Sequence, residues 1–401
     1  MEIPPSRALT RDARRAQRNL MRAFFIDLAR VLGRRAWAVC FCLVGVAAVP
    51  LAPAQSLDSP PPASLQNARV ALRNKAPSTA STLSPLGSDA WQAGTPAPSS
   101  IARYAFAQVG QDFYIFGGGN ENGPIANAWR YSATTDSWTP LADVPLPTEA
   151  GAAAVLNGKI YLAQGWTSPA PATNAFRIYD IATNTWSEGA PRPGVPYSFG
   201  AAAGAFNGKV FVVGGGLAAN QTLSIYDVAS NTWTAGPSAP APFLLGGYTT
   251  VGRYLYLVGS FNPTPQSNSG VVMRLDMETQ TWSVGPALPS RRADLGLASA
   301  GSKLFAIGGD VDGGTYFDGA AQVEELETAF WASGAWVTSA DSLPAARQGA
   351  QAGFFSTARA NGEIWSSGGF TAVGLATQYR TDNLYRVTPA IVTPTPTPTP
   401  T

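Results

Sequence analysis

The side chains that most often carry out catalysis or bind transition metals are nearly absent from this chain of 401 residues. It has no histidine, and its two cysteines, Cys40 and Cys42, both lie near the amino terminus. Ser–His and Cys–His nucleophile pairs are therefore excluded, as are copper or zinc sites built on imidazole and thiolate ligands. Acid–base chemistry would have to use Asp, Glu, Lys, Arg or Tyr side chains. We expect no metal and no cofactor.

Three arginines stand where a charged ligand could be held. Arg103, Arg292 and Arg347 each lie near the start of a repeated segment, and a guanidinium can bind a carboxylate through two parallel hydrogen bonds. We predict that they contact a ligand, with packing between the repeated segments as the alternative. The segment 310–318 places acidic residues around glycines as part of a calcium loop would, but the later glutamate is missing, which favours a solvated loop.

The strands expected to hold these side chains belong to a repeated sequence unit. Similar short phrases end in tryptophan at steps of 47 to 54 residues, at Trp91, Trp138, Trp186, Trp233, Trp282 and Trp336. A period of this size indicates repeated supersecondary units. In the third unit we predict strands at 199–206, 210–213, 223–228 and 232–235. Asn207-Gly208 is a hairpin signal between the first two strands, and Gly214-Gly215 ends the second.

These units resemble the kelch repeat. The matching features are the paired glycines and a tyrosine seven residues before the tryptophan, at Tyr131, Tyr179 and Tyr226. The resemblance covers about residues 88–388 and implies an all-β fold, a six-bladed β-propeller of kelch-type four-stranded blades. Because the Tyr and Trp recur at one place in the unit, we interpret them as packing between neighbouring sheets.

The two ends of the repeat array are each incomplete. The last unit offers three strands, at 351–355, 364–367 and 383–387, whereas the segment ending at Trp91 is a fourth strand without its first three. We predict that the strand near Trp91 completes the last blade and closes the ring, which removes two exposed sheet edges. Five blades with an unpaired strand at each end is the alternative.

The chain outside the repeats indicates export. Residues 1–54 contain nine arginines, an apolar run at 36–49 and the sequence Ala52-Pro53-Ala54, the three-part form of a signal peptide. A retained membrane anchor, a start at Met21 and twin-arginine export are the alternatives left open. Residues 55–87 are predicted to be a Pro/Ser/Ala-rich linker, and 389–401 a Thr-Pro spacer. We expect a secreted, periplasmic or cell-surface protein without a membrane span after cleavage.

Charge gives little support to a nucleic-acid partner. Nine of the 27 lysines and arginines lie in the first 54 residues, so the remaining chain carries more acidic than basic side chains. A repeat domain of this kind has no basic footprint for a nucleic acid. The chain would act as a monomer or as part of a longer surface protein.

Function is expected in the loops that follow the glycine pairs, because these differ from unit to unit. We predict that they bind a protein or carbohydrate partner on one face, with ligand contacts from Arg103, Asn120, Glu121, Trp166, Phe261, Arg292, Tyr316, Arg347 and Phe370. The aromatic members of this set have no evident place in the repeat. The resemblance also implies an alternative, a carbohydrate-active enzyme of the sialic acid epimerase (mutarotase) type that uses a central arginine and an acid.

Overall fold

The computed structural model separates Ser88–Thr401, the second of two units, from the residues before it. It describes residues 91–167, 173–195, 198–216, 220–263, 266–311, 319–328, 331–339, 342–355, 362–373 and 376–387. The predicted signal peptide (1–54), linker (55–87) and Thr-Pro spacer (389–401) lie outside the described residues. Within the described ranges, no helix is long and apolar enough to cross a membrane.

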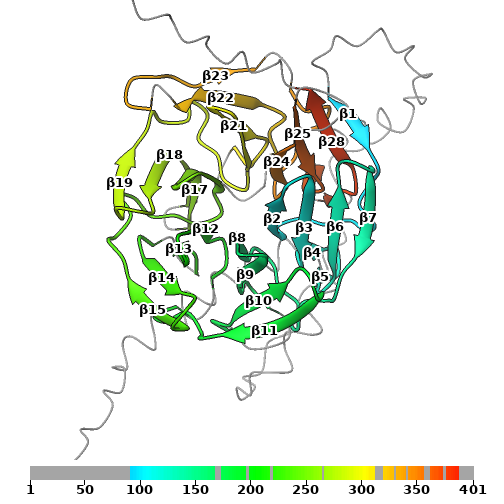
Figure 1. Ribbon diagram of the computed structural model, residues 1–401. Coiled ribbons are helices and arrows are strands. Elements are labelled where there is room, and N and C mark those ends of the chain that lie inside the picture. Colours follow the sequence, from blue (N-terminus) through cyan, green and yellow to red (C-terminus); the bar gives the residue numbers. More distant parts are fainter. Residues whose placement is uncertain are drawn as a thin grey trace, which may run out of the picture. The chain divides into compact units, whose positions relative to one another are not determined.

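The second unit is a β-propeller of six antiparallel four-stranded sheets over the described residues, arranged around a centre (Figure 1). We number the blades 1 to 6 in chain order. Blade 1 contains β2 (Ala105–Val109), β3 (Asp112–Phe116), β6 (Ala128–Ser132) and β7 (Ser137–Pro140). Blade 2 contains β8 (Ala152–Leu156), β9 (Lys159–Ala163), β10 (Phe176–Asp180) and β11 (Thr185–Gly189). Blade 3 contains β12 (Ala202–Phe206), β13 (Lys209–Val213), β14 (Leu223–Asp227) and β15 (Thr232–Ala235).

The other three blades follow the same plan. Blade 4 contains β16 (Gly247–Val251), β17 (Tyr254–Pro263), β18 (Gln266–Asp276) and β19 (Thr281–Val284). Blade 5 contains β20 (Gly296–Ala300), β21 (Lys303–Ile307), β22 (Val323–Glu327) and β23 (Val337–Thr338). Blade 6 contains β24 (Gln351–Phe355), β25 (Glu363–Ser367), β28 (Asn383–Val387) and β1 (Gln92–Gly94).

The ring is closed by a strand from the start of the repeat region. β1 pairs antiparallel with β28, with Ala93 opposite Leu384, and so supplies the fourth strand of blade 6. Trp91, directly before β1, is buried with residues of blades 5 and 6. The predicted closure and the six-bladed fold are therefore confirmed, and the five-bladed alternative is wrong.

The recurring tryptophans join each blade to the one before it. The indole Nε1 of Trp186 donates to the carbonyl of Ala142 at 2.9 Å, and Trp233 repeats this bond to Ala190 at 2.7 Å. The tyrosines also join blades: the hydroxyl of Tyr179 donates to Asn184 Oδ1, which accepts the N–H of Ala142 as well. The recurring Trp and Tyr residues therefore pack between neighbouring sheets, which confirms the prediction from their constant spacing.

The glycine pairs let neighbouring blades approach at backbone level. Gly214 has φ 63°, and a Cβ built on it would lie 2.3 Å from the carbonyl oxygen of Phe243, where blade 4 begins. The next residue, Gly215, donates its N–H to that same carbonyl at 3.0 Å. Only a residue without a side chain fits this junction.

Two predicted elements differ in extent. The strand expected at 199–206 begins only at Ala202, because Gly200 has φ 67° and cannot continue a strand. In blade 4 the loop expected after Gly259-Ser260, the counterpart of the glycine pair, instead begins with strand residues, since β17 runs on to Pro263 and pairs with β18 beyond a register shift at Val258/Ser260. Two small hairpins are added, β4 (Gly119–Asn120) with β5 (Gly123–Pro124), and β26 (Phe370–Val373) with β27 (Ala376–Tyr379).

The closure makes Trp91 important for stability. Trp91→Ala should lower the free energy of unfolding by about 3–5 kcal/mol, as expected for truncating a buried tryptophan. Guanidinium chloride unfolding followed by circular dichroism measures this change. Val284→Ala, at an exposed position in β19, is the control and should leave the midpoint nearly unchanged. Equal midpoints for the two variants would contradict the role assigned to Trp91.

Two glycines with positive φ separate conformational strain from crowding. Gly208→Ala meets nothing within 4 Å, so it should cost only the left-handed penalty of about 1–2 kcal/mol. Gly214→Ala adds a clash with the carbonyl of Phe243 and should cost about 1–3 kcal/mol more. Denaturant midpoints in the same buffer compare the two. A larger loss for Gly208→Ala would show that the blade junction tolerates a side chain.

Candidate ligand site at the centre of one face

Six backbone hydrogen bonds form a closed circle at one end of the propeller. Each blade contributes one residue of left-handed conformation just before its first strand, with φ between 50° and 67°. We call these residues the axial ring: Arg103, Ala150, Gly200, Leu245, Asp294 and Gly349. The N–H of each donates to the carbonyl of the ring residue in the preceding blade at 2.5–2.8 Å, and Arg103 closes the circle by donating to Gly349.

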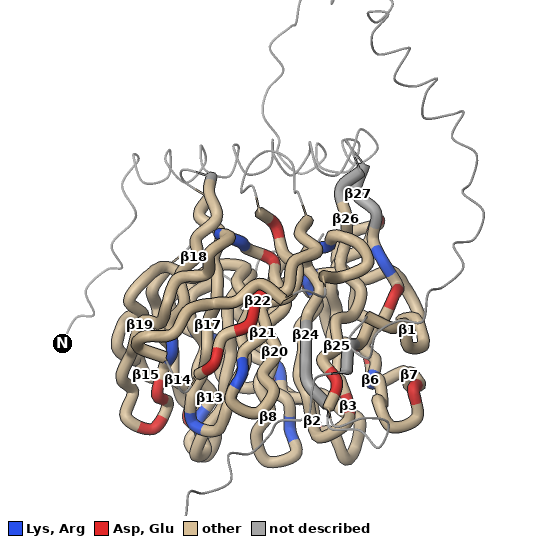
Figure 2. Tube along the Cα trace, turned by 90° about the horizontal axis from the view of Figure 1, so that it is seen from above, with Lys and Arg blue, Asp and Glu red and all other residues tan. Residues whose placement is uncertain are grey.

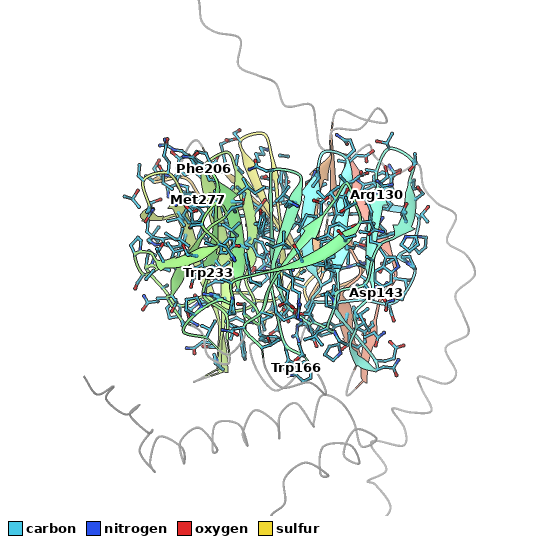
Figure 3. All side chains as sticks on the ribbon, turned by 60° about the horizontal axis from the view of Figure 1, so that its bottom comes forward. Arg130, Asp143, Trp166, Phe206, Trp233 and Met277 are labelled. Atoms are coloured by element: carbon cyan, nitrogen blue, oxygen red, sulfur yellow. The ribbon has the colours of Figure 1, made fainter. Side chains whose placement is uncertain are left out.

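The axial ring and the loops after the glycine pairs lie on the same face. In each blade the residue that follows the glycine pair accepts from or donates to the residue before the ring position, as Trp166 does with Glu149 and Phe370 with Gln348. We call this end the ring face. Figure 2 shows β18 and the β26–β27 hairpin projecting from one end of the propeller, and Figure 3 places Trp166 and Phe206 at opposite ends.

The aromatic residues of the ring face do have a place in the repeat. Trp166, Phe261 and Phe370 occupy the equivalent position in blades 2, 4 and 6, next to the residue before the ring. Blades 1, 3 and 5 carry Gly119, Gly216 and Asp310 there. The sequence analysis missed this alternation, although aligning the units on the second residue of each glycine pair would have revealed it.

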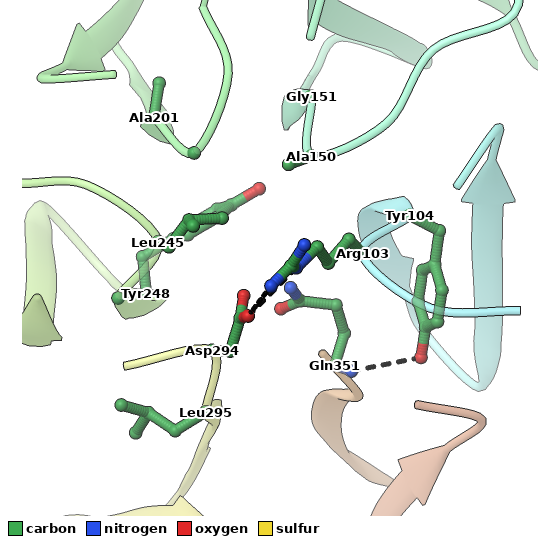
Figure 4. A pocket seen from close by; sticks show the side chains of 12 residues that line it. Arg103, Tyr104, Ala150, Gly151, Ala201, Leu245, Tyr248, Asp294, Leu295 and Gln351 are labelled. Carbon is green, nitrogen blue, oxygen red and sulfur yellow. Dashed lines mark hydrogen bonds and ion pairs between the residues drawn. The ribbon is translucent and has the colours of Figure 1, made fainter. Parts of the chain in front are cut away.

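A pocket of about 330 Å³, measured with its open mouth, lies at the axial ring. Its polar side chains are Arg103, Asp294, Tyr248 and Gln351, as Figure 4 shows. Small residues from blades 2 and 3 and leucines from blades 4 and 5 form the rest of its wall, namely Ala150, Gly151, Gly200, Ala201, Leu245 and Leu295. One side of the pocket is therefore polar and the other mostly apolar.

Arg103 is held by two acidic residues of other blades. Its Nε donates to Asp294 Oδ2 at 2.9 Å, Nη2 contacts the same oxygen, and Nη1 lies 3.4 Å from Glu149 Oε1. The ring of Phe370 lies 5.1 Å from the guanidinium carbon, within cation–π range. Burial alone would lower the pKa of Arg103, but the two carboxylates together raise it, so the guanidinium is charged.

Burial shifts the neighbouring groups toward their neutral forms. Burial raises the pKa of Glu149, and the contact with Arg103 offsets only part of this rise. Burial also raises the pKa of Tyr248 to about 12 and that of Tyr379, beside Glu149 and Arg103, to about 12. The phenol oxygen of Tyr248 accepts the N–H of Ala153 at 3.1 Å, and its proton is retained at neutral pH for donation.

The other two predicted arginines lie inside the blades. Arg292 and Arg347 are at most 1% exposed, and each donates to the carbonyl of the first glycine of a pair, Gly308 at 2.6 Å and Gly368 at 3.3 Å. Each also pairs with a carboxylate, Glu324 and Asp382 respectively. Burial lowers the pKa of both arginines, and the carboxylates raise it again in part.

Arg192, which sequence reasoning did not single out, has the same environment. It is buried, donates to the carbonyl of Gly214 at 3.0 Å and to Ser224 Oγ at 3.0 Å, and its pKa is lowered to about 10 by burial. It lies several residues further from the ring position than Arg292 and Arg347 do, so the repeat pattern conceals the equivalence.

The remaining predicted contacts are spread around the ring face. Asn120 and Glu121 belong to the β4–β5 hairpin, where Asn120 Oδ1 accepts the N–H of Asn122 and Glu121 Oε2 accepts from Ser100 Oγ at 3.0 Å. Phe261 lies in the extended part of β17. Tyr316 lies outside the described residues. Among the residues that the structure describes, no group of three His, Cys, Asp or Glu side chains could hold a metal ion.

The family model for the kelch motif matches residues 101–145, 150–193 and 198–240, which correspond to blades 1 to 3. Blades 1 to 3 are therefore kelch repeats. The chain is 28% identical over 127 residues to a kelch repeat and BTB domain-containing protein 12 from Homo sapiens, and 30% identical over 132 residues to beta-scruin from Limulus polyphemus. It is 34% identical over 92 residues to an F-box/kelch-repeat protein from Arabidopsis thaliana.

These matches cover 28%, 31% and 22% of this chain. They span only 20%, 14% and 23% of the respective relatives. The likeness therefore concerns the repeats, and the relatives' further domains lie outside it. Kelch propellers are typically protein-interaction modules, and this propeller has the corresponding architecture.

The buried carboxylate of Glu149 predicts a pH dependence of stability. Because its pKa is raised in the folded protein, the folded state binds the proton more tightly than the unfolded chain does. The wild type therefore loses stability as the pH rises from the ordinary carboxylate pKa through the raised value. Glu149→Gln lacks this loss.

The melting temperature of Glu149→Gln relative to wild type should thus rise between about pH 4 and pH 7. Differential scanning calorimetry in matched buffers measures the difference. Glu188→Gln, at a carboxylate whose side chain is 72% exposed, is the control. Curves of wild type and Glu149→Gln that run parallel over this range would contradict the assignment.

Proposed function

We propose that this kelch propeller is a binding module of the cell exterior that recognises a protein or carbohydrate partner through its ring face. The observation that carries the proposal is the position after the glycine pair. In all six blades the residue there is hydrogen-bonded to the residue before the axial ring, yet it is Gly, Trp, Gly, Phe, Asp and Phe in turn. The residues that repeat are used to join blades, so variation at a uniform position supports a role outside the fold.

Projecting hairpins support the same face. The β4–β5 hairpin, the tip of β17–β18 and the β26–β27 hairpin all leave the blades on the side of the axial ring. They would surround a ligand seated over the pocket. On the other face the blades end in tight turns such as Asn157-Gly158 and Asn207-Gly208, both with positive φ.

The location outside the cell is supported by the sequence of residues 1–54, with its arginines, apolar run and Ala-Pro-Ala ending. We propose that the propeller is secreted, periplasmic or displayed at the cell surface.

Arg103 distinguishes a binding module from the alternative, a sialic acid epimerase. Such an enzyme would need a guanidinium that is free to donate hydrogen bonds to the carboxylate of a sugar acid. Here Arg103 already contacts Asp294 and Glu149, so an anionic substrate would have to compete with one acid and face the other. This arrangement favours binding over that reaction.

The test compares substitutions on the two faces of the full chain. Candidate ligands come from a glycan array and from envelope proteins captured on the immobilised chain, and each is titrated by isothermal calorimetry. Trp166→Ala and Phe261→Ala should weaken binding at least tenfold, while Lys209→Ala and Lys303→Ala, beside turns of the other face, should leave it unchanged. A ligand lost only with the lysine variants would contradict the proposal.

A further inference from the structure

Three polar side chains from different blades point into the pocket at the axial ring. They are the Tyr248 hydroxyl of blade 4, the Asp294 carboxylate of blade 5 and the Gln351 amide of blade 6, and Figure 4 shows them around the guanidinium of Arg103. Among the residues that the structure describes, no hydrogen bond joins these three side chains to one another. They converge on a space that none of them fills.

Each of the three groups can form a further hydrogen bond. Tyr248 Oη accepts the N–H of Ala153 at 3.1 Å, so the hydroxyl hydrogen is available for donation. The ion pair of Asp294 uses Oδ2, and Oδ1 remains as an acceptor. Gln351 bonds Tyr104 through its backbone N–H, whereas its side-chain amide offers both a donor and an acceptor. A donor, an acceptor and a group that is both therefore face the same space.

The space between these groups has the size of a water molecule. The centre of a water-sized molecule can occupy about 20 Å³ there, and the larger volume of about 330 Å³ includes open solvent. About 10–15 Å³, measured in the same way, is enough for one water, which needs two to four polar partners. A larger ligand would fit only if the surrounding side chains moved.

The charges around the space favour a neutral occupant. The charged guanidinium of Arg103 opposes a cation, and the carboxylates of Asp294 and Glu149 oppose an anion. Water carries no net charge and both donates and accepts hydrogen bonds. It can therefore bond to Asp294, Tyr248 and Gln351 at the same time.

We propose that one ordered water molecule binds at the axis, where it donates to Asp294 Oδ1, accepts from the Tyr248 hydroxyl and bonds to the side-chain amide of Gln351. Tyr248 also bonds Ala153 of blade 2, and Asp294 also holds Arg103 of blade 1. The water thus completes a network of side chains that joins five of the six blades in addition to the backbone circle. This site is independent of the partner proposed for the ring face.

A crystal structure of the full chain, at a resolution that defines buried waters, tests the site directly. We expect one water within about 2.6–3.2 Å of at least two of the three groups, Asp294 Oδ1, Tyr248 Oη and the Gln351 amide. An empty space at the axis, or a water that bonds only one of these groups, would overturn the proposal.

The substitution Gln351→Met tests the same site in solution through the sign of its effect on stability. The Gln351 side chain makes no direct hydrogen bond within the described residues, so without the water an apolar side chain of similar shape should leave stability unchanged or raise it. If the water is bound, the substitution removes one of its partners and should lower the melting temperature by about 2–4 °C. An unchanged or higher melting temperature would count against the water.

The matched control is Gln111→Met at the β2–β3 turn on the other face, where the amide oxygen is buried without a hydrogen-bond partner in the protein. Crystal structures of the two variants should differ at the axis. We expect the water to remain in Gln111→Met and to be lost from Gln351→Met. A water at the same place in both variants would show that Gln351 does not hold it, and the proposed site would be wrong.

Discussion

Six backbone hydrogen bonds form a closed circle around the propeller axis, and each blade must supply one donor and one acceptor to it. Each ring residue must accept from the next blade and donate to the one before, so the circle exists only if the sixth blade returns to the first. That return depends on β1, which comes from the opposite end of the repeat region and pairs with β28. The circle in turn requires left-handed backbone at Arg103, Ala150, Leu245 and Asp294, each a conformational cost that the closed ring must offset.

In the closed ring, the residues that stabilise the fold differ from those that are available to bind a partner. The hydrogen bonds from Trp186 and Trp233 to the preceding blade are equivalent to each other, and the close backbone approach at Gly214 also joins two blades. The buried arginines Arg292 and Arg347 belong to the same set, because they satisfy glycine carbonyls left at the junctions. The positions that vary lie beside the axial ring, and in every blade they are hydrogen-bonded to the residue before it.

Arg103 differs from Arg292 and Arg347 because its carboxylate partners come from other blades. Asp294 is 191 residues away and Glu149 belongs to the next blade, so the pocket exists only in the closed propeller. A buried guanidinium between two carboxylates is balanced for charge only in part. Burial raises the pKa of Glu149, and the contact with Arg103 offsets part of that rise. The pocket therefore contains both hydrogen-bond donors and hydrogen-bond acceptors.

The sequence alone determined the repeat, the hairpin turns, the role of Trp and Tyr in packing, and the closure through Trp91, because each depends on local residue types at a constant period. It also located the loops of the ring face and named Arg103. Only the tertiary structure decided which residues meet: Arg103 with Asp294 and Glu149, Arg292 and Arg347 inside the blades, and the aromatic residues of blades 2, 4 and 6 at one equivalent position. The physical reason is that local periodicity specifies each blade, whereas contacts across the axis arise when all six blades close.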